Sequence, residues 1–145
     1  MTRPPIDTVM MTVAEAMACR ATCVRRAVGA VITTADNRIL ATGYNGVPRG
    51  QTHCLDTPCP GAHAPSGRDI DLCQAVHAEQ NALVNCRDIG AAAKIYVTTM
   101  PCVSCVKLLI NTAIRHIYFR DSYPEMSRAL ELWLRDPERT CTQID

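Results

Sequence analysis

The sequence predicts an α/β layer fold in which helices cover both faces of a central sheet. Short runs rich in Val and Ile alternate with longer segments whose apolar residues recur at helical spacing. Two of these runs, residues 27–34 and 38–44, flank the polar turn Ala35-Asp36-Asn37 and so predict an antiparallel hairpin. The later runs are separated by single predicted helices, a pattern typical of right-handed strand-helix-strand crossovers.

The segments around the hairpin have different patterns. Residues 7–20 repeat apolar residues at helical spacing, with Asp7 or Thr8 as a cap, and predict an amphipathic helix. Residues 45–72 carry glycines, prolines, cysteines and histidines without a sustained period, which predicts a long ordered loop. Residues 74–86 contain several alanines and spaced apolar residues, so we expect a helix that begins close to His77.

The second half of the chain alternates short strands with helices. Residues 94–99 and 116–120 are short apolar runs that predict strands. Residues 102–113 place apolar side chains on one face, and Pro101 just before them is a natural helix start. Residues 124–134 predict a last helix, whereas the polar tail, residues 135–145, predicts no clear element. Residues 1–145 are expected to form one domain, since this length suits a single core.

Composition narrows the class of protein. Hydrophobic residues make up 48% and charged residues 20% of the chain, as in ordinary soluble globular proteins. The formal net charge of +1 gives no general field that would hold a long nucleic acid. No apolar run approaches the roughly 18 to 20 residues that span a bilayer, and the first residues lack the apolar core of a secretion signal. We therefore expect no nucleic-acid or membrane partner, and a cytoplasmic protein, in the host cytoplasm if the chain is viral.

The cysteines indicate metal binding rather than disulfides. There are nine, an odd number, and Cys102 and Cys105 form a Cys-x-x-Cys pair beside a proline. Three residues apart in the first turn of a predicted helix, they can point both sulfurs at one ion, and the helix dipole favours their thiolate form. His77, at the start of another predicted helix, supplies a third ligand. Three protein ligands leave one tetrahedral position open, as catalytic zinc requires.

Glu79 lies two residues after His77 and is the candidate catalytic acid and base. From the first turn of the helix its carboxylate can reach a water molecule at the metal without binding the metal itself. Alone, His77 is more typical of a capping or surface residue, and a single Cys-x-x-Cys of a redox pair or a structural half-site. Together and in this order, the two motifs match the signature of zinc deaminases, His-x-Glu followed by Pro-Cys-x-x-Cys.

Four motifs between residues 8 and 123 resemble the cytidine deaminase superfamily, and more closely its deoxycytidylate deaminases. They are Val28-Gly29-Ala30-Val31-Ile32, Gly43-Tyr44-Asn45-Gly46, His77-Ala78-Glu79-Gln80-Asn81-Ala82 and Met100-Pro101-Cys102-Val103-Ser104-Cys105. The resemblance implies a three-layer α/β/α fold with a mixed central sheet of about five strands. It also implies zinc-dependent conversion of dCMP to dUMP with release of ammonia, a step that feeds thymidylate synthesis.

The resemblance implies roles for several residues. Glu79 takes a proton from water and delivers it to N3 of cytosine while hydroxide attacks C4, and it then protonates the departing amino group. Asn45 contacts the sugar or base, and the Ala78 backbone holds the pyrimidine edge. A cation must face the 5′-phosphate, and Arg26 is the first choice. Tyr123 resembles a tyrosine near the phosphate, although it reads equally well as a packing residue.

The resemblance also implies regulation and assembly. Enzymes of this branch are commonly hexamers, activated by dCTP and inhibited by dTTP near the Gly-Tyr-Asn-Gly loop. Exposed glycines there would bring backbone N–H groups close to a triphosphate and its Mg²⁺. The same residues also read as a plain turn. The candidate effector residues are Gly43, Tyr44, Asn45 and Gly46.

Two questions stay open at the level of sequence. The loop after the hairpin is rich in soft ligands and would hold either a second, structural zinc or simply buried thiols. Its candidates are Cys23, His53, Cys54, Cys59, His63 and Cys73. The alternative functions are deamination of another base or nucleoside, including adenosine in tRNA, and a zinc-binding module without chemistry.

Overall fold

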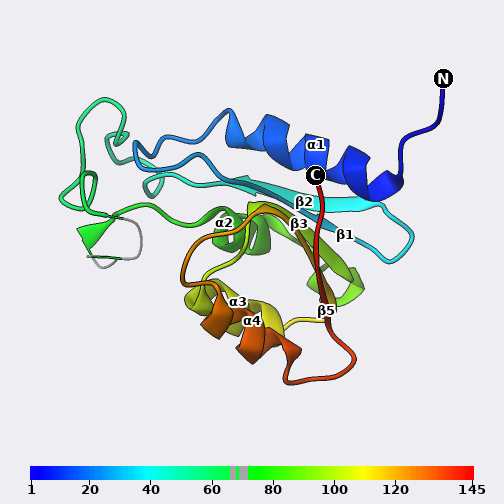
Figure 1. Cartoon of the computed structure of the whole chain (residues 1–145). Helices are drawn as coiled ribbons and strands as arrows, with labels where there is room; N and C mark the ends of the chain where they lie inside the picture. Colours follow the sequence, from blue (N-terminus) through cyan, green and yellow to red (C-terminus); the bar gives the residue numbers. More distant parts are fainter. Residues whose placement is uncertain (66–67, 69–71) are drawn as a thin grey trace.

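The computed structural model describes residues 1–65, 68 and 72–145, which form a five-stranded sheet with helices on both faces (Figure 1). The order of strands across the sheet is β2-β1-β3-β4-β5. This confirms the predicted α/β fold with a mixed sheet. The elements are α1 (Ile6–Ala18), β1 (Gly29–Thr33), β2 (Ile39–Tyr44), α2 (Ala78–Asn85), the 3-10 helix η2 (Ile89–Ala91), β3 (Lys94–Thr99), α3 (Val103–Ile110), β4 (His116–Asp121), α4 (Ser127–Leu134) and β5 (Thr140–Gln143).

The sheet combines an antiparallel and a parallel half. Strand β1 pairs antiparallel with both β2 and β3, whereas β3, β4 and β5 run parallel to one another. Asn37 makes the hairpin turn between β1 and β2 with a positive φ of 68°, a conformation that Asn tolerates. At the other end of the sheet, the Met100 N–H donates to the Asp121 carbonyl oxygen at 2.9 Å. The carboxyl ends of β3 and β4 are therefore held together at one edge.

The two faces of the sheet carry separate cores, because side chains alternate along each strand. Ile32, Ile95 and Val97 face the layer formed by α2, α3 and α4, where Trp133 and Leu109 are fully buried. The opposite face packs under α1 alone. Figure 1 shows α1 on one side of the sheet and the other three α-helices on the other side. The α1 core consists of Met10, Met11, Ala14, Val31 and Tyr96.

The polar tail forms a strand that the sequence did not predict. Residues Thr140–Gln143 are mostly exposed, and they pair in parallel with β4 at the edge of the sheet. Backbone pairing holds this strand, together with a hydrogen bond of 2.8 Å from the Trp133 Nε1 to the Thr140 carbonyl oxygen. An edge strand without an apolar face has no periodic signal, so only the tertiary context reveals it. The predicted last helix is also too long, since α4 begins at Ser127 rather than near residue 124.

The segment after β2 is irregular, as predicted. Residues 45–65 form turns and bends, apart from one isolated bridge between Gly46 and Val76. Several hydrogen bonds tie this segment to the chain before β1. Among them, the Leu55 N–H donates to the Thr22 carbonyl oxygen, and the Arg25 guanidinium donates to the Pro65 carbonyl oxygen at 2.8 Å. Within the described part of the chain, every helix falls short of the length and apolarity needed to cross a bilayer.

Candidate functional site

The two predicted motifs meet beside the carboxyl end of β3. Pro101 leads from this strand into α3, with Cys102 as the cap of that helix and Cys105 in its first turn. His77 is the cap of α2, and its N–H donates to the Gln80 Oε1 at 2.9 Å, which fixes the first turn. Both helices therefore begin at the same place, with the His77 and cysteine side chains directed at one another.

Gly43 allows α2 to lie close to the sheet. A Cβ atom at this position would lie 2.3 Å from the Ala78 carbonyl oxygen and 2.5 Å from the Ala82 backbone nitrogen. Any larger residue would therefore push α2 away from β2. The Asn81 Nδ2 also donates to the Tyr44 carbonyl oxygen at 2.8 Å, which anchors the helix to the end of β2.

The donor atoms of His77, Cys102 and Cys105 form a compact group. All three lie within 4.8 Å of one another, and the His77 Nδ1 is 3.5 Å from the Cys102 Sγ and 3.3 Å from the Cys105 Sγ. Zn–N and Zn–S bonds in a tetrahedral site separate their donors by about 3.5 Å. The set of one imidazole and two thiols therefore fits zinc in both chemistry and spacing.

The protonation states of the three residues are coupled. Hydrogen bonds from Cys105 and His77 lower the pKa of Cys102 to about 4, which makes it a thiolate at neutral pH. The hydrogen bond between Cys105 and Cys102 raises the pKa of the Cys105 thiol. The hydrogen bond between His77 and Cys102 raises the pKa of the His77 imidazole. The Cys102 thiolate therefore places a negative charge between the Cys105 thiol and the His77 imidazole, an arrangement suited to binding a cation.

Glu79 is buried next to this group, with only 4% of its surface exposed. Burial raises the pKa of its carboxyl to about 7, against the opposing effect of His77. The nearby Cys105 thiol has a smaller, opposing effect on this pKa. A carboxyl that is half protonated near neutral pH can both accept and donate a proton, as a general acid and base must.

The group opens into a cavity of about 1330 Å³. His77, Glu79 and Cys102 line it. The four residues predicted to bind substrate also line it, namely Arg26, Asn45, Ala78 and Tyr123. The structure therefore brings together the predicted catalytic, metal-ligating and substrate-binding residues around one space.

Asn45 and Tyr123 each have a partner within the protein. The buried Asn45 amide donates to the Arg26 carbonyl oxygen and accepts from the Val28 N–H, so it holds the loop before β1 in place. The Tyr123 hydroxyl donates to the Pro101 carbonyl oxygen at 3.3 Å, and burial raises its pKa to about 12. Both residues therefore shape the wall of the cavity as well as facing it.

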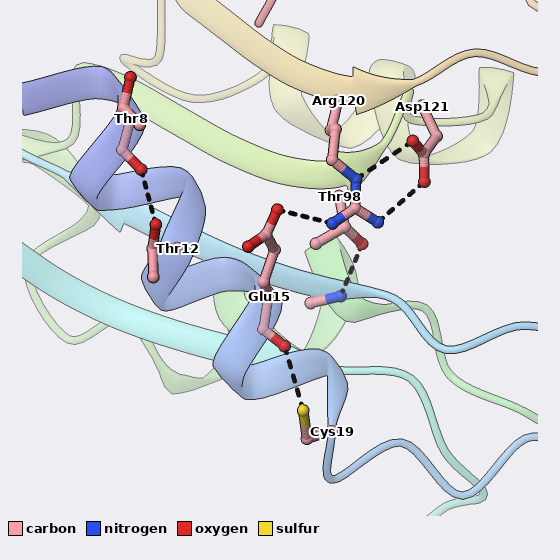
Figure 2. Close-up of polar contacts among 8 residues, drawn as sticks. Thr8, Thr12, Glu15, Cys19, Thr98, Arg120 and Asp121 are labelled. Carbon is pink, nitrogen blue, oxygen red and sulfur yellow. Dashed lines mark hydrogen bonds and ion pairs between the residues drawn. The ribbon is translucent and has the colours of Figure 1, made fainter. Parts of the chain in front are cut away.

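An ion-pair cluster joins the end of β4 to α1 (Figure 2). The Arg120 guanidinium donates to both Asp121 carboxylate oxygens, at 3.1 and 2.9 Å, and to the Glu15 Oε1 of α1 at 2.6 Å. Next to it, the Gly29 N–H donates to the buried Thr98 Oγ1. These contacts fix α1, β1 and the end of β4 relative to one another.

The expectation of exposed glycines in the Gly-Tyr-Asn-Gly loop is wrong. Gly43 and Gly46 are both buried, Gly43 against α2 and Gly46 beside Thr22. Their strand and bridge pairings also occupy this backbone, with the Gly46 N–H donating to the Val76 carbonyl oxygen and the Asn45 N–H to that of Val28. The two glycines of this motif therefore allow close packing between backbone segments, and they do not expose N–H groups to a ligand.

The cysteine-rich segment brings thiols together without a finished metal site. A hydrogen bond from the Gln74 backbone, with further bonds from the Cys54 and Cys73 thiols, lowers the pKa of Cys59. Burial raises the pKa of Cys73, with smaller effects of Cys23 and Cys59. Across residues 1–65, 68 and 72–145, however, the group around His77 is the only one with three such ligands within 4.8 Å.

Neither predicted histidine of this segment joins its thiols. His53 and His63 are both exposed, and no hydrogen bond of the described residues connects either ring to a cysteine of the segment. Among the described residues, therefore, nothing connects His53 or His63 to the cysteines of this segment.

Sequence reasoning missed several residues of the cavity wall. Arg25 lines it from the loop before β1, while Glu125, Ser127 and Arg128 line it from the start of α4. The only available signal was position in the sequence: Arg25 is adjacent to Arg26, and the other three follow Tyr123 within a few residues. For residues 124–134 the sequence predicted a helix and no role in the site.

Comparison with known proteins gives the family. Residues 5–121 match the family described as the cytidine and deoxycytidylate deaminase zinc-binding region. The chain belongs to this family. The match covers the hairpin and all three donors of the zinc site, so the zinc-binding character of the family and the geometry of His77, Cys102 and Cys105 agree.

Individual members of the deaminase family are similar over most of the chain. The deoxycytidylate deaminase of Schizosaccharomyces pombe is 38% identical over 125 residues, which cover 83% of this chain. The chain spans only 38% of the length of that relative. The deoxycytidylate deaminase of Mycobacterium phage D29 is also 38% identical, over 82% of this chain and 97% of its own length.

The fold agrees with that of solved family members. The dCMP deaminase from the cyanophage S-TIM5, in a complex with dCMP and dUMP, superposes with a TM-score of 0.75. The alignment covers 99% of this chain and all of the other, at 25% identity. The three-layer arrangement predicted from the sequence is therefore the fold of this family.

Proposed function

We propose that the protein is a zinc-dependent hydrolase that converts dCMP to dUMP with release of ammonia. The observation that carries the proposal is the buried Glu79 carboxyl beside the three zinc ligands, His77, Cys102 and Cys105, at the wall of an open cavity. A closed structural zinc site has no use for such a carboxyl. The similarity to deoxycytidylate deaminases, one of them solved with dCMP and dUMP, supports the choice of substrate.

Glu79 would carry the protons of the reaction. Zinc, when bound, supplies the nucleophile by lowering the pKa of a water molecule. Glu79 accepts a proton from water and delivers it to N3 of the cytosine ring. After hydroxide has added to C4, Glu79 transfers the remaining hydroxyl proton to the amino group, which leaves as ammonia while the C4 carbonyl forms. Its pKa near 7 suits both transfers, because acid and base forms are both populated at neutral pH.

The wall of the cavity would position the nucleotide. The Ala78 N–H lies in the first turn of α2, has no intrahelical partner, and can hold the pyrimidine edge. Asn45 would contact the sugar, and its amide keeps the loop that carries Arg26 in place. The product dUMP would then feed thymidylate synthesis.

A comparison of substrates tests the proposal. The purified zinc-loaded protein would be assayed with dCMP, CMP, cytidine, deoxycytidine, guanine and a tRNA anticodon stem. We expect dCMP to give the highest kcat/KM. Turnover of unphosphorylated substrates alone would refute the nucleotide assignment, and turnover of none would favour a zinc module without chemistry. The net charge of +1 argues against the tRNA substrate.

Control by dCTP and dTTP, with Mg²⁺, is the corresponding proposal for regulation. The buried glycines do not offer free N–H groups, so an effector near Gly43–Gly46 would be bound by side chains or by a neighbouring subunit. Exposed apolar residues on α2 and α3, Val84 and Leu108, support assembly into a homo-oligomer such as a hexamer. Millimolar dTTP should lower dCMP turnover and raise Tm, and no shift in Tm would contradict the effector site.

A second zinc, held by Cys23, Cys54, Cys59 and Cys73, is the proposal for the insertion after β2. The Cys59 N–H donates to the Cys54 Sγ at 3.4 Å, and the pKa of Cys73 responds to the neighbouring Cys23 and Cys59, which supports it. Metal analysis should then give two zinc ions per chain, falling to one in the Cys59→Ser variant; one zinc in both proteins would refute it.

All nine cysteines are free, which fits a reducing compartment, and we place the enzyme in the cytoplasm.

A further inference from the structure

The zinc ligand His77 lies at an abrupt junction in the chain. Before it, residues 73–75 have no regular structure, and Val76 exchanges two backbone hydrogen bonds with Gly46, at 2.7 and 3.1 Å. After it α2 begins, and the Asn81 N–H donates to the His77 carbonyl oxygen at 3.0 Å. The His77 N–H lies between these two sets of bonds, so its own partner decides how the residue enters the helix.

That partner is the Gln80 side chain, whose Oε1 accepts the His77 N–H at 2.9 Å. Gln80 is half-buried, and it lines both the zinc cavity and a shallow pocket between α2 and α3. A glutamine or glutamate three residues after the cap of a helix is the second half of a capping box. The contact is therefore that of a well-formed helix start, and here the cap residue is also a metal ligand.

His77 is an unusual residue at such a position. The usual caps are Ser, Thr, Asp and Asn, whose side-chain oxygens accept N–H groups of the first turn. The His77 Nδ1 instead lies 3.5 Å from the Cys102 sulfur and 3.3 Å from the Cys105 sulfur, and a lone pair that binds a metal cannot also accept an N–H. The Gln80 bond does not use the imidazole, so it holds the start of α2 whether or not Nδ1 binds zinc.

From this arrangement we infer that Gln80 is a positioning residue for the zinc site: it fixes the His77 backbone so that the imidazole faces Cys102 and Cys105 before the metal binds. Without the Gln80 acceptor, His77 is free to leave its extended conformation, with φ of −70° and ψ of 154°. Zinc then binds only the fraction of molecules whose imidazole faces the sulfurs, and the apparent affinity falls by that fraction. The inference rests on the zinc centre of the proposed function and is independent of the substrate.

The test measures the zinc affinity of the metal-free protein by competition with a chromophoric chelator. Gln80→Leu keeps a similar size but removes the acceptor, whereas Gln80→Glu keeps an acceptor in the capping-box position. Asn85→Leu is the matched control, a polar residue changed to leucine at the exposed end of the same helix. We expect Gln80→Leu to weaken zinc binding by about 3- to 30-fold, the size of a lost cap, and the other two variants to weaken it by less than about twofold.

Urea denaturation of the metal-free proteins separates positioning from helix capping alone. Lower stability of Gln80→Leu with unchanged zinc affinity would show that Gln80 only stabilises the helix, and would overturn the inference. Equal losses of zinc affinity in Gln80→Leu and Gln80→Glu would overturn it as well, because the second variant keeps the acceptor. A wild-type protein that binds no zinc would refute the zinc centre itself, whereas the variant outcomes leave that centre intact.

Discussion

The Asn45 side-chain amide donates to the Arg26 carbonyl oxygen at 2.6 Å and accepts the Val28 N–H at 2.8 Å. One buried side chain therefore satisfies two backbone groups of the loop that carries Arg26 into the cavity. The loop has no regular structure of its own at Arg26. Its conformation depends on a residue nearly twenty positions later in the chain.

The Asn45→Asp variant tests this dependence. Aspartate keeps the acceptor for Val28 but places a carboxylate oxygen opposite the Arg26 carbonyl, where two acceptors repel. We expect the free energy of unfolding to fall by about 1 to 3 kcal/mol, measured by urea denaturation, and KM for dCMP to rise. Asn85→Asp is the control, since exposed Asn85 makes only a long bond of 3.4 Å to Thr42. Equal losses in the two variants would contradict the role of Asn45.

The Glu79→Gln variant separates proton transfer from metal binding. Glutamine has the size of glutamate but cannot carry the proton, and it leaves all three zinc ligands in place. We expect kcat to fall by about two to four orders of magnitude while the zinc content of the protein is unchanged. Glu125→Gln, a cavity carboxylate on the opposite wall, should change kcat by less than about tenfold. Wild-type activity in Glu79→Gln would refute the mechanism.

The contact between β2 and α2 predicts that Gly43→Ala is destabilising. The new methyl group would meet the backbone of α2 at 2.3 Å, and backbone atoms cannot rotate away as a flexible side chain can. We expect a loss of at least about 1 to 3 kcal/mol in the free energy of unfolding, with weaker zinc binding because His77 begins α2. Gly90→Ala is the control, because no atom lies within 4 Å of a Cβ at Gly90. A Gly43→Ala protein as stable as Gly90→Ala would show that α2 can move without cost.

The ion pair between Arg120 and Asp121 predicts a pH-dependent contribution to stability. The Arg120 guanidinium lowers the pKa of the Asp121 carboxyl from its ordinary 3.8, so folding favours the ionised form. The contribution is complete above the pKa of the unfolded chain and is lost as pH falls through the lower pKa of the folded protein. Because about half of the carboxylate is exposed, solvent screens the pair.

We therefore expect Asp121→Asn to cost about 0.5 to 1 kcal/mol at about pH 7, and this difference from wild type to shrink toward zero near pH 2. Urea denaturation across this range measures it. Asp56→Asn, in the exposed part of the insertion and outside the ion pairs of the described residues, should give no such trend. A constant difference between Asp121→Asn and wild type at every pH would contradict the assignment.

Much of the fold and the centre of the site could be predicted because each depends on local sequence. The apolar runs around Asn37 predict the hairpin, and the spacing of Cys102 and Cys105 predicts two sulfurs on one helical turn. Strand β5 could not be predicted, because it is specified by an open edge of β4 and by Trp133 rather than by its own residues. Arg128 was missed for a similar reason, since only the tertiary fold places α4 and the loop of Arg26 on the wall of one cavity.

The sequence was also misread where one pattern serves two purposes. A glycine predicts either a backbone N–H that a ligand can reach or a close contact between two backbone segments, and the sequence alone does not distinguish these two cases. Gly43 and Gly46 are of the second kind. Val84 is the opposite case. An apolar residue at helical spacing predicts burial, yet Val84 is 82% exposed.

The close approach of Gly43 to Ala78 and Ala82 also limits how such a protein can be redesigned. A protein engineer who wishes to widen the substrate range would first enlarge or shrink residues around the zinc ligands. Ala78, between His77 and Glu79, cannot be enlarged in this way, since it is fully buried and its carbonyl oxygen faces β2 at Gly43. A bulkier residue at Gly43 cannot be compensated by trimming Ala78, because the atoms it meets belong to the main chain. Useful variation is therefore confined to the opposite wall, formed by α4 and the loop before β1.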